Sequence, residues 1–190
     1  TCSSSINSYF IYFPQKKNKI KLLVSLVVFS LLLIGFASAQ TLIVDSCKKA
    51  AAKEPFMKYD FCVNSLTQDP QSKTATTLEG LVLASTKNAA AETLNVKGLA
   101  EQILKGKGYG PGMEAGLHKC VKIYGGAYDF LNTALANVQS HHYSTAVEEF
   151  LYASFAPFDC VKYYWISPFA KESYIIFEKI LIPMTLTKML

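Results

Sequence analysis

The segment MEAGLHKCVKIYGGAYDFLNTALANV, residues 113–138, decides the fold class of this 190-residue chain. Its apolar side chains recur at intervals of three and four, which is the spacing of one face of an α-helix. The stripe consists of Met113, Leu117, Cys120, Val121, Tyr124, Tyr128, Leu131, Leu135 and Val138. A stripe of this length predicts a long helix that buries one side in a helical bundle.

Similar spacing on either side of this segment predicts further helices. One stripe occupies residues 78–103, with a polar interruption, and another occupies residues 143–160. An apolar stretch closes the chain after Ser167-Pro168, where proline suits the first turn of a helix. Two short helices within residues 41–66, on either side of Pro55, should precede these as a hairpin. The prediction is an all-α fold, an antiparallel four-helix bundle with an N-terminal helical hairpin.

Local signals set the expected helix boundaries. Thr76 and Glu79 stand at the spacing of a capping box, which opens a helix. Glycines crowd residues 106–112 and should end that helix. Pro183 should kink or shorten the last helix, because proline lacks the backbone donor that a helix interior needs.

The first forty residues have the three parts of a secretory signal peptide. A nearly unbroken apolar run, residues 22–36, is followed by Ala37-Ser38-Ala39, and cleavage there would leave Gln40 at the N-terminus. The basic part before the run holds Lys16, Lys17, Lys19 and Lys21. We expect residues 1–39 to be an N-terminal extension with a signal peptide and residues 40–190 to be one domain.

The alternative use of this segment is an uncleaved membrane anchor, since residues 22–39 approach the roughly 20 residues that span a bilayer. The small-residue end favours cleavage. Four of the 19 lysines lie in the segment and the 14 acidic residues all follow it, so the remaining chain is nearly neutral. The chain also contains no arginine for contacts to phosphates or bases. We therefore expect a secreted protein whose partner is neither a nucleic acid nor, after cleavage, a membrane.

Four cysteines follow the predicted cleavage site, at positions 47, 62, 120 and 160. An even number of cysteines in an exported chain indicates disulfides. No two of them have the short spacing of a zinc site, so we expect no metal. Four cysteines allow three connectivities, and spacing alone does not decide among them. We adopt local pairing, Cys47 with Cys62 and Cys120 with Cys160.

No arrangement of residues indicates catalysis. The three histidines, at positions 118, 141 and 142, stand outside any hydrolase or metalloprotease motif. Glu148 and Glu149 are neighbours on a predicted helix, where their side chains diverge, so they do not form a catalytic carboxylate pair. We expect a protein that is not an enzyme, uses no cofactor and acts by binding.

Two groups of residues match a known pattern. The first comprises Ser46-Cys47-Lys48-Lys49, Tyr59-Asp60-Phe61-Cys62-Val63-Asn64-Ser65-Leu66 and Asp69-Pro70-Gln71-Ser72. The second comprises Cys120, Tyr124, Tyr143, Ala146, Ala153-Ser154, Cys160 and Lys171-Glu172. With these residues, the chain from Gln40 to Leu190 resembles the plant invertase/pectin methylesterase inhibitor family, and within it the pollen-allergen-like branch of invertase inhibitors.

The resemblance implies a bundle with two local disulfides, exported to the apoplast or cell wall. It also implies that the protein blocks pectin methylesterase (pectinesterase) or acid invertase by one-to-one contact. Pectin methylesterase inhibitors of the family carry acidic residues two, six and nine positions after the third cysteine, which are Lys122, Gly126 and Asp129 here. Family members that inhibit cell-wall invertase carry Pro-Lys-Phe at the turn where this chain has His141-His142-Tyr143.

The candidate partner-binding residues are Lys122, Gly126, Asp129, His142, Tyr143 and Asp159. Only one of the three acids is present, and the Pro-Lys-Phe element is absent. The alternative is therefore a secreted helical binding protein without inhibitory activity, or a decayed member of the family with the same fold.

Overall fold

The computed structural model describes the backbone of residues 15–106, 110–162 and 170–190, and within the first helix the side chains of residues 21–27 and 39–53. All regular elements of this described part are helices, so the predicted all-α fold is confirmed. The helix start expected at Ser167-Pro168 lies outside the described residues.

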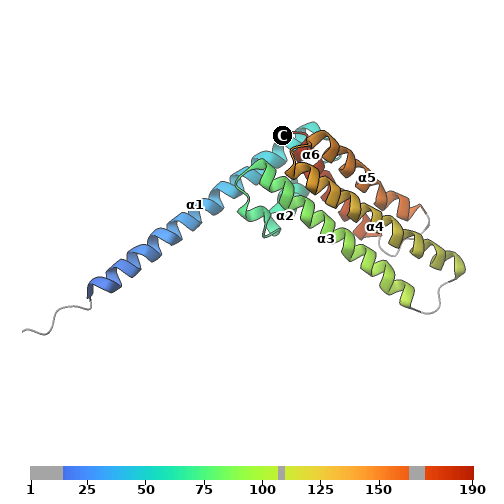
Figure 1. Cartoon of the computed structure of the whole chain (residues 1–190), viewed down its shortest axis with the longest axis horizontal. Helices are drawn as coiled ribbons and strands as arrows, with labels where there is room; N and C mark the ends of the chain where they lie inside the picture. The colour runs from blue at the N-terminus through green and yellow to red at the C-terminus, as the bar shows by residue number, and fades with distance from the viewer. Residues whose placement is uncertain (1–14, 107–109, 163–169) are drawn as a thin grey trace, which may run out of the picture.

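Four helices form the bundle: α3 (Leu78–Lys105), α4 (Pro111–Gln139), α5 (Tyr143–Val161) and α6 (Ala170–Thr187). Each helix packs on the next, and α6 closes the ring against α3. Consecutive helices run in opposite directions, as the colours of Figure 1 show. The predicted antiparallel four-helix bundle is confirmed. Pro183 lies inside α6, which continues beyond it to Thr187.

The centre of the bundle is filled by large side chains that have no contact with solvent. Tyr124 of α4 and Phe150 of α5 are both fully buried. The hydroxyl group of Tyr124 shares a hydrogen bond of 2.7 Å with the hydroxyl of Ser173 on α6. Burial raises the pKa of Tyr124 to about 12, although this hydrogen bond acts in the opposite direction. The predicted stripe of α4 therefore supplies the core.

Two expectations for α3 are wrong. The helix is capped by Thr77 rather than Thr76, because the Thr77 hydroxyl accepts a hydrogen bond from the backbone N–H of Gly80 at 3.0 Å. The polar stretch near Glu92 does not interrupt the buried stripe. Thr93 is fully buried there, because its hydroxyl donates to the carbonyl of Ala89 at 2.8 Å and is thereby satisfied.

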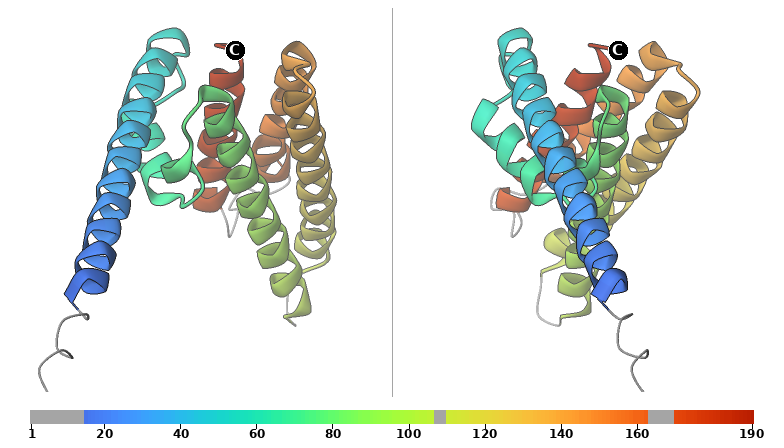
Figure 2. Two further views of the ribbon diagram at one scale, coloured as in Figure 1. Left: turned by 60° about the vertical axis from the view of Figure 1, so that its left-hand side comes forward. Right: turned by 90° about the vertical axis from the view of Figure 1, so that its left-hand side faces the viewer.

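The hairpin before the bundle consists of α1 (Gln15–Lys53) and α2 (Tyr59–Gln68), followed by the short 3₁₀-helix η1 (Ser72–Thr74). The expected short first helix is instead the end of a 39-residue helix. The N-terminal part of α1 extends beyond the bundle, as Figures 1 and 2 show. The helix α1 runs through the expected cleavage position without a break, and the signal peptide stays a prediction. Among the residues whose side chains are described, which leave out residues 15–20 and 28–38 of α1, no helix combines the length and the hydropathy that crossing a bilayer requires.

Both predicted disulfides are present. Cys47 and Cys62 join α1 to α2, with sulfurs 2.02 Å apart, and Cys120 and Cys160 join α4 to α5, with sulfurs 2.05 Å apart. All four cysteines are fully buried. The disulfides therefore close the hairpin and one pair of bundle helices separately, and neither links the hairpin to the bundle.

Candidate partner-binding site

The register between α4 and α5 is set by two contacts. The disulfide brings the Cα atoms of Cys120 and Cys160 to 4.9 Å, and further along the pair the rings of Phe130 and Tyr152 lie with their centroids 5.5 Å apart. In an antiparallel pair with this register, Gly126 of α4 comes level with Phe155 of α5. Residues from two distant parts of the sequence thus share one outward surface.

The three candidates on α4 lie on one strip of that surface. Lys122, Gly126 and Asp129 are four and three residues apart, which places them on the same side of the helix. Lys122 and Asp129 are exposed and Gly126 is partly exposed. No atom lies within 4 Å of the point where a Cβ at Gly126 would stand. Position 126 therefore has room for a side chain, although this chain has none there.

An exposed cluster of large apolar side chains adjoins this strip. The exposed fraction is 39% for Phe130 of α4, and on α5 it is 44% for Leu151, 55% for Tyr152, 50% for Phe155 and 55% for Phe158. We call these five residues the aromatic face. Single exposed apolar residues are ordinary, whereas several on adjacent helices mark a binding surface.

The aromatic face continues onto a third helix. The ring of Phe158 packs edge-to-face on the ring of Phe177 of α6, with centroids 4.9 Å apart. Together with the Phe130–Tyr152 contact, this packing fixes the rings at both sides of α5. Rings that are already held in place lose little conformational entropy when a partner covers them.

The aromatic face was not predicted from the sequence, although a local signal for it is present. Leu151, Phe155 and Phe158 follow one another at intervals of four and three, so they form a second apolar stripe on α5. The first stripe, with Ala146 and Phe150, faces the core. A helix that is apolar on two sides needs a second partner for its outer side.

Charged residues border the aromatic face. Asp129 precedes Phe130, Glu148 lies one turn before Tyr152, and Asp159 follows Phe158; all three carboxylates are exposed. Lys122 lies near Asp159, next to the disulfide end of the pair. The centre of the surface is thus apolar and its border carries charges of both signs.

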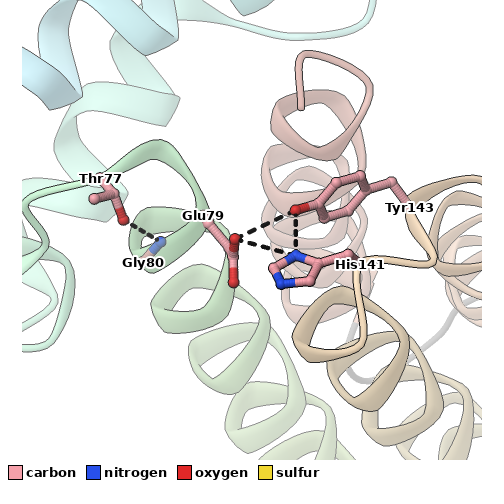
Figure 3. Close-up of polar contacts among 5 residues, drawn as sticks. All are labelled: Thr77, Glu79, Gly80, His141 and Tyr143. Carbon is pink, nitrogen blue, oxygen red and sulfur yellow. Dashed lines mark hydrogen bonds and ion pairs between the residues drawn. The ribbon is translucent and has the colours of Figure 1, made fainter.

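The turn between α4 and α5 is held by a contact with α3. His141 has a positive φ of 59° and occupies the left-handed position that often follows the end of a helix. Its Nδ1 lies 2.7 Å from the hydroxyl of Tyr143 and 3.5 Å from a carboxylate oxygen of Glu79. The Tyr143 hydroxyl donates to the same oxygen at 3.3 Å. Figure 3 shows both side chains turned toward Glu79. Desolvation, and then the nearby Glu79 charge, raise the pKa of Tyr143.

The candidate residues therefore belong to two places. Lys122, Gly126, Asp129 and Asp159 lie on the outward surface of α4 and α5, near the aromatic face. His142 is exposed at the opposite end of the pair, about 20 Å along the helix from Asp129 at 1.5 Å per residue. Tyr143 is half-buried and turned toward α3. The turn and the strip do not form one compact site.

The described side chains offer no arrangement for holding a metal. No group of three or more His, Cys, Asp or Glu residues gathers among them at a distance suitable for coordination. The one ion pair among them that includes a histidine, between His141 and Glu79, is a structural contact of the turn.

Comparison with known proteins gives a consistent result. The family model for plant invertase/pectin methylesterase inhibitors matches residues 41–157. Pectinesterase inhibitor 12 of Arabidopsis thaliana is 54% identical over 174 residues, which cover 90% of this chain and 99% of that protein. A Platanus acerifolia protein named "Putative invertase inhibitor" is 35% identical over 129 residues, or 66% of this chain and 71% of that protein.

Solved structures agree on the fold. A crystal structure of a mutant form of a pectin methylesterase inhibitor from Arabidopsis superimposes with a TM-score of 0.61 at 19% identity, covering 70% of this chain and 89% of that one. A second crystal structure, of a pectin methylesterase inhibitor from Arabidopsis thaliana, gives a TM-score of 0.57 at 17% identity, covering 79% of this chain and 96% of that one. The sequence match, the two disulfides and the helical bundle together show that this chain belongs to the plant invertase/pectin methylesterase inhibitor family.

Proposed function

We propose that the protein is a secreted inhibitor of pectin methylesterase, which it blocks by forming a one-to-one complex through the outward surface of α4 and α5. The mechanism is steric: the helices cover the opening of the enzyme's active site, and no bond in the inhibitor is made or broken. The protein itself has no catalytic role in this function.

One observation about the surface supports this proposal. The two helices are held side by side by a buried disulfide and present an apolar centre with a charged border on a rigid frame. Interfaces between proteins have this composition, an apolar centre with a polar rim. Helices that are already positioned lose little further entropy on binding.

Two further points favour pectin methylesterase over invertase. The relative with 54% identity along nearly its whole length is named a pectinesterase inhibitor, whereas the Platanus relative with the invertase inhibitor name is 35% identical. The turn also has His141-His142-Tyr143 where invertase inhibitors of the family carry Pro-Lys-Phe. In this chain two of those residues are directed at Glu79 of the same molecule.

The test is a titration of both enzymes. The protein, recovered from an exporting plant host with both disulfides formed, is added to a plant pectin methylesterase and to a cell-wall invertase at pH 5 and pH 7. We expect saturable inhibition of pectin methylesterase with a stoichiometry of one to one. N-terminal sequencing of the same sample should start at Gln40.

A matched pair of variants locates the contact. Gly126→Asp introduces an acidic residue at a position with open space around it, and should change inhibition. Gly98→Asp on α3, where nothing lies within 4 Å of a Cβ either, is the control and should not. If the protein inhibits invertase and not pectin methylesterase, invertase is its target instead. Inhibition of neither enzyme would favour a helical binding protein without this activity.

A further inference from the structure

We propose that the aromatic face is the anchor by which this protein binds pectin methylesterase, and that it takes the place of the acidic side chains that the family pattern has at positions 122 and 126. This inference rests on the function proposed above and adds the source of the affinity. It assigns the main contacts to Tyr152, Phe155 and Phe158 of α5, with Phe130 of α4 beside them.

The position of Gly126 supports this assignment. In the α4–α5 register, Gly126 is level with Phe155, and no atom occupies the space that its side chain would take. The family pattern has an acidic side chain at this position, which would come level with Phe155 along the helix pair. In this chain, Phe155 is 50% exposed and the α4 position level with it carries no side chain. A partner can therefore contact Phe155 from above and from the α4 side.

The charged residues around the aromatic face indicate the kind of partner that it binds. Asp129, Glu148 and Asp159 surround the aromatic face together with Lys122 and with Lys162, which lies one turn after Phe158. A membrane surface with anionic lipids would need a basic border, since negative headgroups attract lysine and repel carboxylates. A protein partner with an apolar patch and charges of both signs around it matches this pattern.

An apolar anchor has a measurable signature. Aromatic residues near the centre of an interface commonly carry most of its affinity, while charges at the border contribute little and are screened by salt. If the aromatic face is the anchor, the inhibition constant should change less than about threefold between roughly 50 and 300 mM NaCl. An interface held mainly by carboxylates would weaken much more over the same range.

The experiment compares two groups of variants in the inhibition assay. Tyr152→Ala and Phe155→Ala should each raise the inhibition constant by about thirtyfold or more, which is the usual effect of truncating a central aromatic anchor. Phe56→Ala and Leu94→Ala, which truncate exposed apolar residues of the hairpin tip and of α3, are the controls and should have no effect. Circular dichroism checks that every variant is folded.

Gly126→Gln supplies an independent test. Its side chain has space on α4 and should partly cover Phe155, and glutamine favours a helix more than glycine does. The variant should therefore unfold at a higher temperature and yet inhibit more weakly. A higher melting temperature with unchanged inhibition would overturn the role of this surface.

The outcomes separate the two proposals. If the wild-type protein inhibits pectin methylesterase and the alanine variants inhibit equally well, the aromatic anchor is wrong and the inhibitor function stands. If the wild-type protein inhibits neither enzyme, the proposed function fails, and the anchor with it. Sedimentation of the free protein at increasing concentration should show a monomer. A stable dimer that Phe155→Ala abolishes would assign the face to a second copy of the chain instead.

Discussion

The hairpin and the four-helix bundle are each closed by one disulfide, but the hairpin packs on the bundle less extensively than the bundle helices pack on one another. Side chains as large as Tyr124 and Phe150 are fully buried between the bundle helices. The hairpin adds Ile43 and Leu66, which are fully buried in the same core, and Lys58 of the hairpin forms an ion pair with Glu178 of α6 at 3.1 Å. The stability of the bundle is thus spread over a large apolar area, whereas the attachment of the hairpin depends on a few contacts. A substitution in the bundle core should therefore destabilise the whole bundle, whereas a substitution in the contacts of the hairpin should loosen the hairpin alone.

The largest effect is expected from truncation of the bundle core. Phe150→Ala should lower the free energy of unfolding by about 3–5 kcal/mol, because it removes a fully buried ring and leaves a cavity. Phe155→Ala, on the same helix but half-exposed, should change stability by about 0.5 kcal/mol or less. Urea denaturation of both variants measures the difference. Equal losses would mean that the outward ring is also part of the core.

Removal of each disulfide compares the two regions directly. On the chain-entropy account, replacing Cys120 and Cys160 with alanine should cost about 4 kcal/mol, since that disulfide closes 40 residues. The same change at Cys47 and Cys62, which close 15 residues, should cost about 3 kcal/mol. In the variant without the Cys47–Cys62 disulfide, hydrogen exchange should become faster mainly in α1 and α2. Faster exchange throughout the bundle in that variant would contradict the separation of the two regions.

Tyr124 should make the stability of the bundle depend on pH in the alkaline range. Its pKa of about 12 in the folded protein lies above the ordinary value of 10, so the folded state holds the proton more tightly. The corresponding stabilisation is complete below pH 10 and is lost as the pH rises toward 12, by up to about 2–3 kcal/mol.

The control for this effect is Tyr124→Phe. At about pH 8 the free energy of unfolding of this variant should be about 1 kcal/mol lower than that of the wild type, because the hydrogen bond to Ser173 is lost. Between pH 10 and 12, however, its free energy of unfolding should fall less than that of the wild type. Unfolding by urea at each pH provides the comparison. Parallel pH curves for the two proteins would exclude Tyr124 as the titrating group.

The smallest effects concern the attachment of the hairpin. Glu178→Gln should cost about 1 kcal/mol or less, because an exposed lysine regains its hydration and the hydroxyl of Tyr174 can still donate to position 178. Lys58→Ala should loosen the hairpin more than this, because it leaves the nearly buried carboxylate of Glu178 without its cation. Hydrogen exchange in α2 reports both variants. Faster exchange for Glu178→Gln than for Lys58→Ala would show that the negative charge itself attaches the hairpin.

Local sequence patterns predicted most of the fold. The spacing of apolar residues identified the bundle helices, since a helix repeats every 3.6 residues. The errors were also local: a cap displaced by one residue to Thr77, and an interruption near Glu92 that the structure does not have. Thr93 shows the reason for the second error, because a side-chain hydrogen bond to the preceding turn satisfies a polar group in the core.

The candidate site was predicted less completely. The positions on α4 and the cysteine pairs followed from the resemblance to the family, and they lie on the exposed strip and in the two disulfides. The stripe of Leu151, Phe155 and Phe158 on α5 could be seen in its local spacing, but the contact of α5 with Phe130 joins residues more than 20 positions apart. The contact of Glu79 with His141 joins residues that are even further apart in the sequence.

The sequence by itself determined that this protein is helical, where most of its helices lie, that it has four cysteines after a hydrophobic N-terminal segment, and which family it resembles. Only the tertiary structure decided which outward residues meet, that Gly126 comes level with Phe155 along the α4–α5 pair, and that the turn at His141 is tied to α3. The physical reason is that helix formation depends on neighbours three and four residues away, whereas the register between helices depends on packing and on a disulfide that joins distant parts of the chain.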